Sequence, residues 1–165
     1  MNRMTRSLLF PLLIALPLAA QPAGPFGAWT LAKAPDLPKV IEAATEAMNF
    51  VTRPIARSRL GKTNSIYQTL RLGREAGAFS IQYDQRQPQI MPADGQAVAW
   101  TREDGEELLI SARMDRDDLV QTYKAKDGAR TNVFHLDPAT RILTLQVTVT
   151  SPRLPGPLNY AITYR

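Results

Sequence analysis

The 165-residue sequence contains no cysteine and only one histidine, His135. The absence of cysteine excludes disulfides, thiolate metal sites, cysteine nucleophiles and lipid attachment through a cysteine. A single imidazole also excludes any metal site built from several histidines. The sequence therefore points to no metal and no cofactor, and it leaves few routes to catalysis.

The remaining catalytic patterns are weak. His135 has no serine in a Gly-x-Ser-x-Gly elbow to activate, and a lone histidine in a strand is usually structural. The acidic stretches 103–107 and 115–118 fall in expected turns, where solvated carboxylates are common, and neither has the spacing of a calcium-binding loop. We expect no catalytic residues and no enzyme, with an esterase or isomerase as the weaker alternative.

Long hydrophobic runs are also scarce, since the one extended uncharged stretch is residues 8–20, which follows Arg3 and Arg6. It is shorter than the about 20 residues that a membrane-spanning helix needs, and two prolines interrupt it. The pattern predicts a signal peptide over residues 1–20 and a flexible leader over 21–25. The mature protein is then periplasmic or secreted, and an uncleaved anchor is the alternative.

The net charge of +5 would fall if Arg3 and Arg6 were removed with a signal peptide, so it is weak support for nucleic-acid binding. The other basic cluster is a group of four residues with no acid among them, Arg53, Arg57, Arg59 and Lys62. Such a group can contact the anionic headgroups of a membrane transiently. A solvated helix face is the plainer interpretation.

A helical segment is expected over residues 37–60. Asp36 is a suitable N-cap, Pro38 fits the first helical turn, and apolar residues then recur at spacings of three and four. Pro54 is expected to end or kink the first helix near Arg53, and a short second helix follows.

From Ser65 onward the apolar pattern alternates, as is typical of strands joined by tight turns. The predicted strands are 27–31, 66–72, 79–83, 97–100, 108–112, 119–124, 131–136, 142–150 and 158–164, with a weak tenth near 89–91. Closing such a meander removes its exposed edges. We therefore predict one all-β domain over residues 26–165, an antiparallel up-and-down β-barrel of about 9–10 strands with the helical segment between strands 1 and 2. A two-sheet sandwich is the alternative.

Gly27-x-Trp29 on the first strand, the helical segment, and a meander that ends in Tyr164-Arg165 resemble the calycin superfamily. The helical insertion is similar to the lid of fatty-acid-binding proteins, whereas Gly-x-Trp and the signal peptide are more lipocalin-like. The order of elements also resembles small exported bacterial lipocalin-like proteins of unknown function. The resemblance implies that Trp29 closes the barrel floor. The last strand departs from the fatty-acid binders, because no arginine stands two residues before Tyr160 or Tyr164 to hold a ligand carboxylate.

A charged residue on each strand marks the outside of the barrel, so the alternate face points inward. This places five neutral polar side chains inside as candidate ligand-binding residues: Gln68, Tyr83, Gln121, Tyr123 and Tyr160. Strand 131–136 is assigned to neither face, and no charge is assigned to the interior. The pattern predicts a small hydrophobic, neutral ligand such as a lipid or isoprenoid. The alternative is a filled barrel that serves as a structural or interaction protein of the cell envelope.

Overall fold

The computed structural model describes residues 24–165, so the predicted signal peptide and most of the predicted leader lie outside the described residues. The described chain forms two helices and ten strands. These are β1 (Gly27–Lys33), α1 (Leu37–Thr45), α2 (Thr52–Thr63), β2 (Thr69–Glu75), β3 (Ala78–Tyr83), β4 (Gln89–Pro92), β5 (Val98–Thr101), β6 (Glu107–Asp115), β7 (Asp118–Ala125), β8 (Gly128–Asp137), β9 (Ile142–Thr150) and β10 (Leu158–Tyr164).

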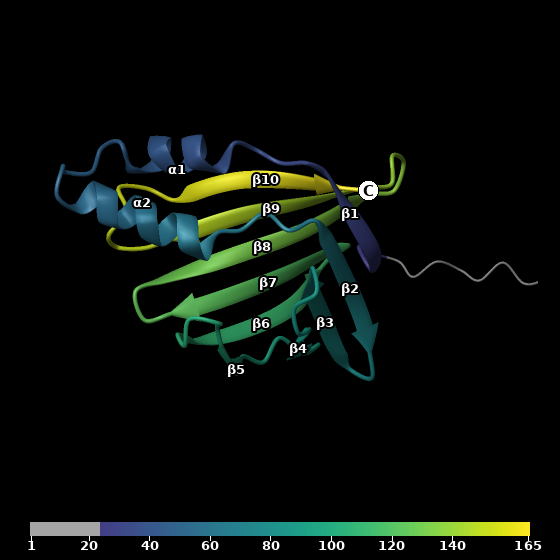
Figure 1. Ribbon diagram of the computed structural model, residues 1–165. Coiled ribbons are helices and arrows are strands. Elements are labelled where there is room, and N and C mark those ends of the chain that lie inside the picture. Colours follow the sequence, from purple (N-terminus) through teal and green to yellow (C-terminus); the bar gives the residue numbers. More distant parts are fainter. Residues whose placement is uncertain (1–23) are drawn as a thin grey trace, which may run out of the picture.

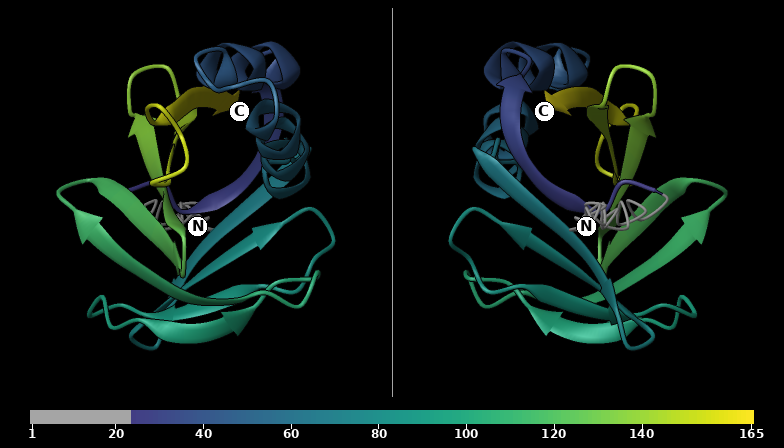
Figure 2. Two further views of the ribbon diagram at one scale, coloured as in Figure 1. Left: turned by 90° about the vertical axis from the view of Figure 1, so that its left-hand side faces the viewer. Right: turned by 90° about the vertical axis from the view of Figure 1, so that its right-hand side faces the viewer.

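All ten strands belong to one antiparallel sheet in the order β4-β3-β2-β1-β10-β9-β8-β7-β6-β5. β1 pairs with β2 on one side and with β10 on the other, so the first and last strands lie side by side. The strands curve around a common interior (Figure 2). Hydrogen-bonded pairing stops between β4 and β5, so the barrel is nearly closed rather than closed. The structure confirms the up-and-down barrel with its helical segment between the first two strands.

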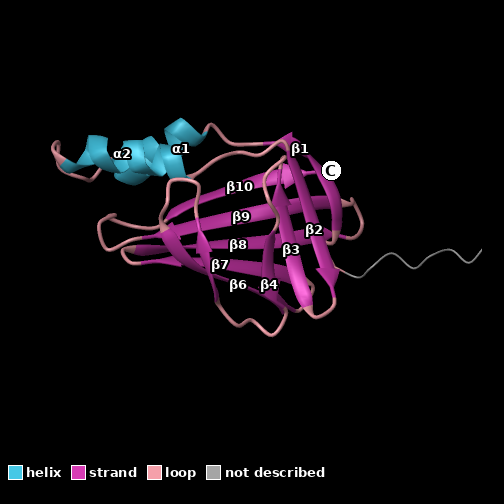
Figure 3. Ribbon diagram, turned by 60° about the horizontal axis from the view of Figure 1, so that its bottom comes forward, coloured by secondary structure: helices cyan, strands magenta, loops and turns pink. Residues whose placement is uncertain are grey.

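Both helices lie at the end of the barrel opposite the C-terminus (Figures 1 and 3). α1 begins as the sequence predicts, because the Asp36 side chain accepts a hydrogen bond from the Lys39 amide at 3.3 Å. Its buried residues are Leu37, Ile41 and Thr45, and it packs against α2 and β10. Neither helix of the described chain has the length and apolar character needed to cross a membrane.

The expectation that Pro54 ends the first helix is wrong. α1 already ends at Thr45, and Pro54 lies in the first turn of α2. Asn49 explains the new start, since its Oδ1 accepts hydrogen bonds from the amides of Val51 at 3.1 Å and Thr52 at 2.9 Å. A proline in the first helical turn loses no helical hydrogen bond. The helical segment therefore consists of two helices joined by an Asn49-centred turn.

The interior of the barrel is packed with side chains from the inward faces of the strands. The largest fully buried ones are Tyr164, Phe79, Phe134, Leu70, Ile81, Met91, Ile110, Leu119, Leu143, Leu145, Leu158 and Ile162. The inward faces expected for β3, β6, β7, β9 and β10 are those that the structure buries. Trp29 is also buried, and its Nε1 donates to the carbonyl oxygen of Pro25 at 2.9 Å.

Candidate functional site

A cavity of about 830 Å³ lies between α2 and the neighbouring ends of the strands. Its apolar wall includes Ile55 and Leu60 of α2, Trp100 of β5, Leu108 of β6 and Val149 of β9. None of the fully buried core side chains named above lines it. The barrel is therefore solid in its core and hollow at the end that the helices cover.

The base of the cavity meets a network of buried polar side chains, here called the interior network: Gln89, Gln121, Asn132, Tyr83 and Tyr123. Gln121 is its centre, since its Oε1 accepts from Tyr83 at 2.8 Å and from Asn132 at 3.0 Å. Its Nε2 donates to Gln89 Oε1 at 2.7 Å, and the Tyr123 hydroxyl donates to the same oxygen at 2.7 Å. Within residues 24–165, no buried side-chain nitrogen or oxygen lacks a partner. The interior network thus needs no ligand to satisfy it.

The phenols around the cavity remain protonated at neutral pH. Burial raises the pKa of Tyr83 well above its ordinary value, and it also raises the pKa of Tyr123 and Tyr160. A neutral phenol both donates and accepts hydrogen bonds. These side chains therefore bring polarity to the cavity without a negative charge.

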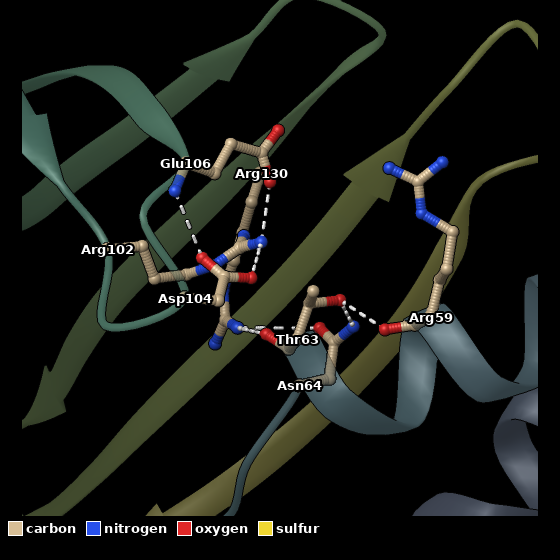
Figure 4. Close-up of polar contacts among 7 residues, drawn as sticks. All are labelled: Arg59, Thr63, Asn64, Arg102, Asp104, Glu106 and Arg130. Carbon is tan, nitrogen blue, oxygen red and sulfur yellow. Dashed lines mark hydrogen bonds and ion pairs between the residues drawn. The ribbon is translucent and has the colours of Figure 1, made fainter.

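Arg130 of β8 brings a positive charge to the cavity wall. Its Nε donates to Asn132 Oδ1 at 2.9 Å, and its Nη1 lies 3.4 Å from both the Thr63 carbonyl oxygen and Asn64 Oδ1 (Figure 4). Burial opposes ionisation of the guanidinium, but the pKa of Arg130 is raised above its ordinary value, because the surrounding tyrosines, Tyr160 foremost, would carry negative charge at the high pH at which an arginine loses its proton. The guanidinium is therefore charged at every physiological pH.

Two of the arginines that line the cavity, Arg59 and Arg130, have no carboxylate partner within residues 24–165. Three arginines at the mouth are each paired with an acid: Arg86 with Glu103 at 3.2 Å, Arg102 with Asp104 at 2.6 Å, and Arg153 with Asp127 at 2.8 Å. Arg59 is exposed, and in Figure 4 its guanidinium points away from Arg102 and Arg130. Of these two unmatched charges, Arg130 is thus the one that is partly buried in the cavity wall.

Asn64, directly after α2, connects the helix to the barrel. Its Oδ1 also accepts from the Tyr160 hydroxyl at 3.1 Å, and its Nδ2 donates to the Leu60 carbonyl oxygen at 2.9 Å. The side chain is almost fully buried. Asn64 therefore holds the C-terminal end of α2 against β8 and β10.

The five residues predicted to bind a ligand have different positions. Tyr83 and Tyr123 line the cavity, Gln121 lies behind them at the centre of the interior network, and Tyr160 is bonded to Asn64. The inward placement of Gln68 is wrong, because that side chain is exposed. β2 begins only at Thr69, so the alternation of the strand does not extend back to residue 68.

The expectation of an uncharged interior is also wrong, because it missed Arg130. β8 begins at Gly128, earlier than the predicted strand, and this places Arg130, Asn132 and Phe134 on one inward face. The sequence feature that could have identified this inward face is Phe134, a large apolar side chain two residues after Asn132 and so on the same face of the strand. Gln89 and Asn64 were missed as well, since the first lies on the weakest predicted strand and the second outside any strand.

No protein-family model and no curated protein sequence matches this chain. Solved structures do match in shape. Fatty-acid-binding protein 1 of Echinococcus granulosus has a TM-score of 0.53 at 14% identity, over 84% of this chain and 94% of that protein. Human cRBP IV has a TM-score of 0.51 at 17% identity, over 87% of this chain and 98% of that protein.

A third similar structure is the secretary abundant heat soluble (SAHS) protein of Ramazzottius varieornatus, with a TM-score of 0.58 at 8% identity, over 85% of this chain and 93% of that protein. The chain has a calycin-like fold. At these identities the likeness concerns the fold alone, and the expected calycin resemblance is confirmed at that level. Within residues 24–165, no group of three or more His, Asp or Glu side chains is placed to hold a metal ion.

Gln121→Leu should destabilise the fold, because it leaves the Tyr83 hydroxyl and the Asn132 amide with fewer partners in a buried site. We expect the free energy of unfolding to fall by about 1–3 kcal/mol, measured by urea denaturation. Thr122→Val, on the opposite face of the same strand, is the matched control. Equal effects of the two substitutions would contradict a structural role for the interior network.

Proposed function

We propose that this protein binds one small amphiphilic molecule without transforming it. The apolar part of the ligand lies among Ile55, Leu60, Trp100 and Leu108, and its polar head lies beside Arg130. The observation that carries this proposal is a guanidinium with no carboxylate partner in the described chain, on the wall of a mostly apolar cavity. Such cavities, with a few placed polar groups, are typical of sites for small hydrophobic ligands.

The charge of Arg130 favours an anionic head over the neutral ligand expected from the sequence. That expectation depended on an interior without charge. A half-buried cation is stabilised by an anion that shares its environment, because desolvation leaves the cation short of partners. The similar structures include fatty-acid-binding proteins, which supports the same ligand class. In this chain the arginine is on β8 rather than on the last strand.

Titration with dodecanoate and dodecanol tests this proposal. Dodecanoate should bind more tightly, and Arg130→Gln should weaken it by about tenfold or more while changing dodecanol little, since a charge-assisted bond is lost. Arg153→Gln, at the cavity mouth and already paired with Asp127, is the control and should have little effect. A preference for the alcohol would contradict the anionic head, and binding of neither probe would favour the envelope interaction protein.

We further propose that the helical end contacts anionic membranes transiently. Phe50, Val51 and Ile55 around the start of α2 are 85%, 59% and 60% exposed, and Arg59 and Lys62 are exposed on the same helix. A group of exposed apolar residues beside basic ones is suited to a lipid surface. The other two basic residues are engaged with the α1 region, since Arg53 donates to the Met48 carbonyl and Arg57 pairs with Glu42.

Phe50→Ser should lower the affinity for vesicles that contain phosphatidylserine by about tenfold or more, because covering such a side chain contributes about 1.5–3 kcal/mol. Ile90→Ser is the control, since Ile90 is also exposed but lies on β4. Co-sedimentation with anionic and with zwitterionic vesicles measures the effect. Equal loss for both variants, or equal binding to both vesicle types, would contradict a specific contact at the helical end.

Export is proposed from the sequence of residues 1–20 alone, with a periplasmic or secreted mature protein. N-terminal sequencing of the protein recovered from an export-competent cell should show a start near Gln21. An intact Met1 would contradict it.

A further inference from the structure

Asn64 and Arg130 make the contact that joins the end of α2 to the barrel wall. Leu60 is the one buried residue of α2, so the position of its C-terminal end depends strongly on the bonds of Asn64. The same guanidinium faces the cavity in which the proposed ligand would lie. The Arg130 guanidinium therefore has two possible sets of partners, the C-terminal end of α2 and the head group of the ligand.

The guanidinium has only one free edge for a two-oxygen head. An arginine binds a carboxylate through two adjacent N–H groups. Its Nε is already bonded to Asn132 Oδ1 at 2.9 Å, which leaves the edge formed by Nη1 and Nη2. Within residues 24–165 Nη2 has no hydrogen bond, whereas Nη1 is shared between the Thr63 carbonyl and Asn64 Oδ1.

The contacts of Nη1 are weak enough to be displaced. Both are 3.4 Å long, beyond the usual 2.9–3.0 Å of an N–H···O bond. Nη1 has two N–H groups, and a carboxylate on the edge formed by Nη1 and Nη2 takes one of them in a shorter, charge-assisted bond. A single-atom head such as a hydroxyl needs only Nη2, so it leaves the contact with Asn64 in place.

We infer that Asn64 determines ligand selectivity by competing with the head group for Nη1 of Arg130, an inference that rests on the proposed function. A two-oxygen anionic head takes one of the two N–H groups of Nη1 and so weakens its contacts with Asn64 and Thr63, which loosens the C-terminal end of α2 while the bond from the Tyr160 hydroxyl to Asn64 Oδ1 remains. A neutral single-atom head does not. Binding of an anionic head and loss of the contact between Asn64 and Arg130 are thermodynamically linked. A stronger contact therefore lowers the preference for anionic over neutral heads.

Asn64→Asp tests the competition, since it keeps the shape of the side chain and places a carboxylate against Nη1; the bond from Nδ2 to the Leu60 carbonyl oxygen is lost in this variant and equally in Asn64→Ala. Dodecanoate should bind about tenfold or more weakly to this variant, while dodecanol should be little changed. Asn64→Ala removes the competitor and should leave dodecanoate binding as tight as in the wild type or tighter. Weaker dodecanoate binding in both variants would indicate simple damage to the site and would overturn the inference.

Hydrogen–deuterium exchange of the wild-type chain provides a readout without substitution. Amides 60–64 should exchange faster with saturating dodecanoate than with saturating dodecanol. Preferential binding of dodecanoate with no such difference, or with slower exchange, overturns the inference and leaves the proposed function standing. If neither probe binds the wild type, the proposed function fails and the inference fails with it.

Discussion

The structure depends on one constraint: polar side chains that the strands place inside the barrel must find their partners inside. Gln121 shows how the constraint is met, because both ends of its amide are bonded to side chains from β3, β4 and β8. An unpartnered amide at that depth would cost about 1–3 kcal/mol. The interior network therefore fixes the relative positions of four strands and marks the boundary between the packed core and the cavity.

This boundary explains why one end of the barrel is solid and the other hollow. On the core side, side chains such as Phe79, Phe134 and Leu145 are fully buried and occupy the interior. On the helical side, the network presents phenols and Arg130 to a space that α2 covers only partly. The positive charge is tolerated because oxygen atoms accept from it: Asn132 Oδ1 from Nε, and the Thr63 carbonyl and Asn64 Oδ1 from Nη1. The guanidinium of Arg130 thus contacts both the cavity and the C-terminal end of α2.

Much of the fold follows from the sequence, because alternation and turn residues are local signals. β9 and β10 have the predicted bounds, and inward residues such as Ile81 and Ile110 are buried as expected. The candidate site is harder to predict. A charged residue was taken as a marker of the outside, and this rule cannot identify Arg130, which is retained inside by partners from distant elements. The inward assignment of Gln68 was wrong because alternation between two faces applies only within a strand, and β2 begins at Thr69. Asn64 was missed because its role depends on the meeting of a helix end with β8 and β10.

The most direct measurement of the central claim is a crystal structure of the protein with 11-bromoundecanoate, in which anomalous scattering locates the bromine. We predict a carboxylate beside the Arg130 guanidinium and a bromine among the apolar residues of the mouth, near Ile55 and Trp100. A bromine beside Arg130 with the carboxylate in solvent, or a ligand bound only outside the cavity, would contradict the account.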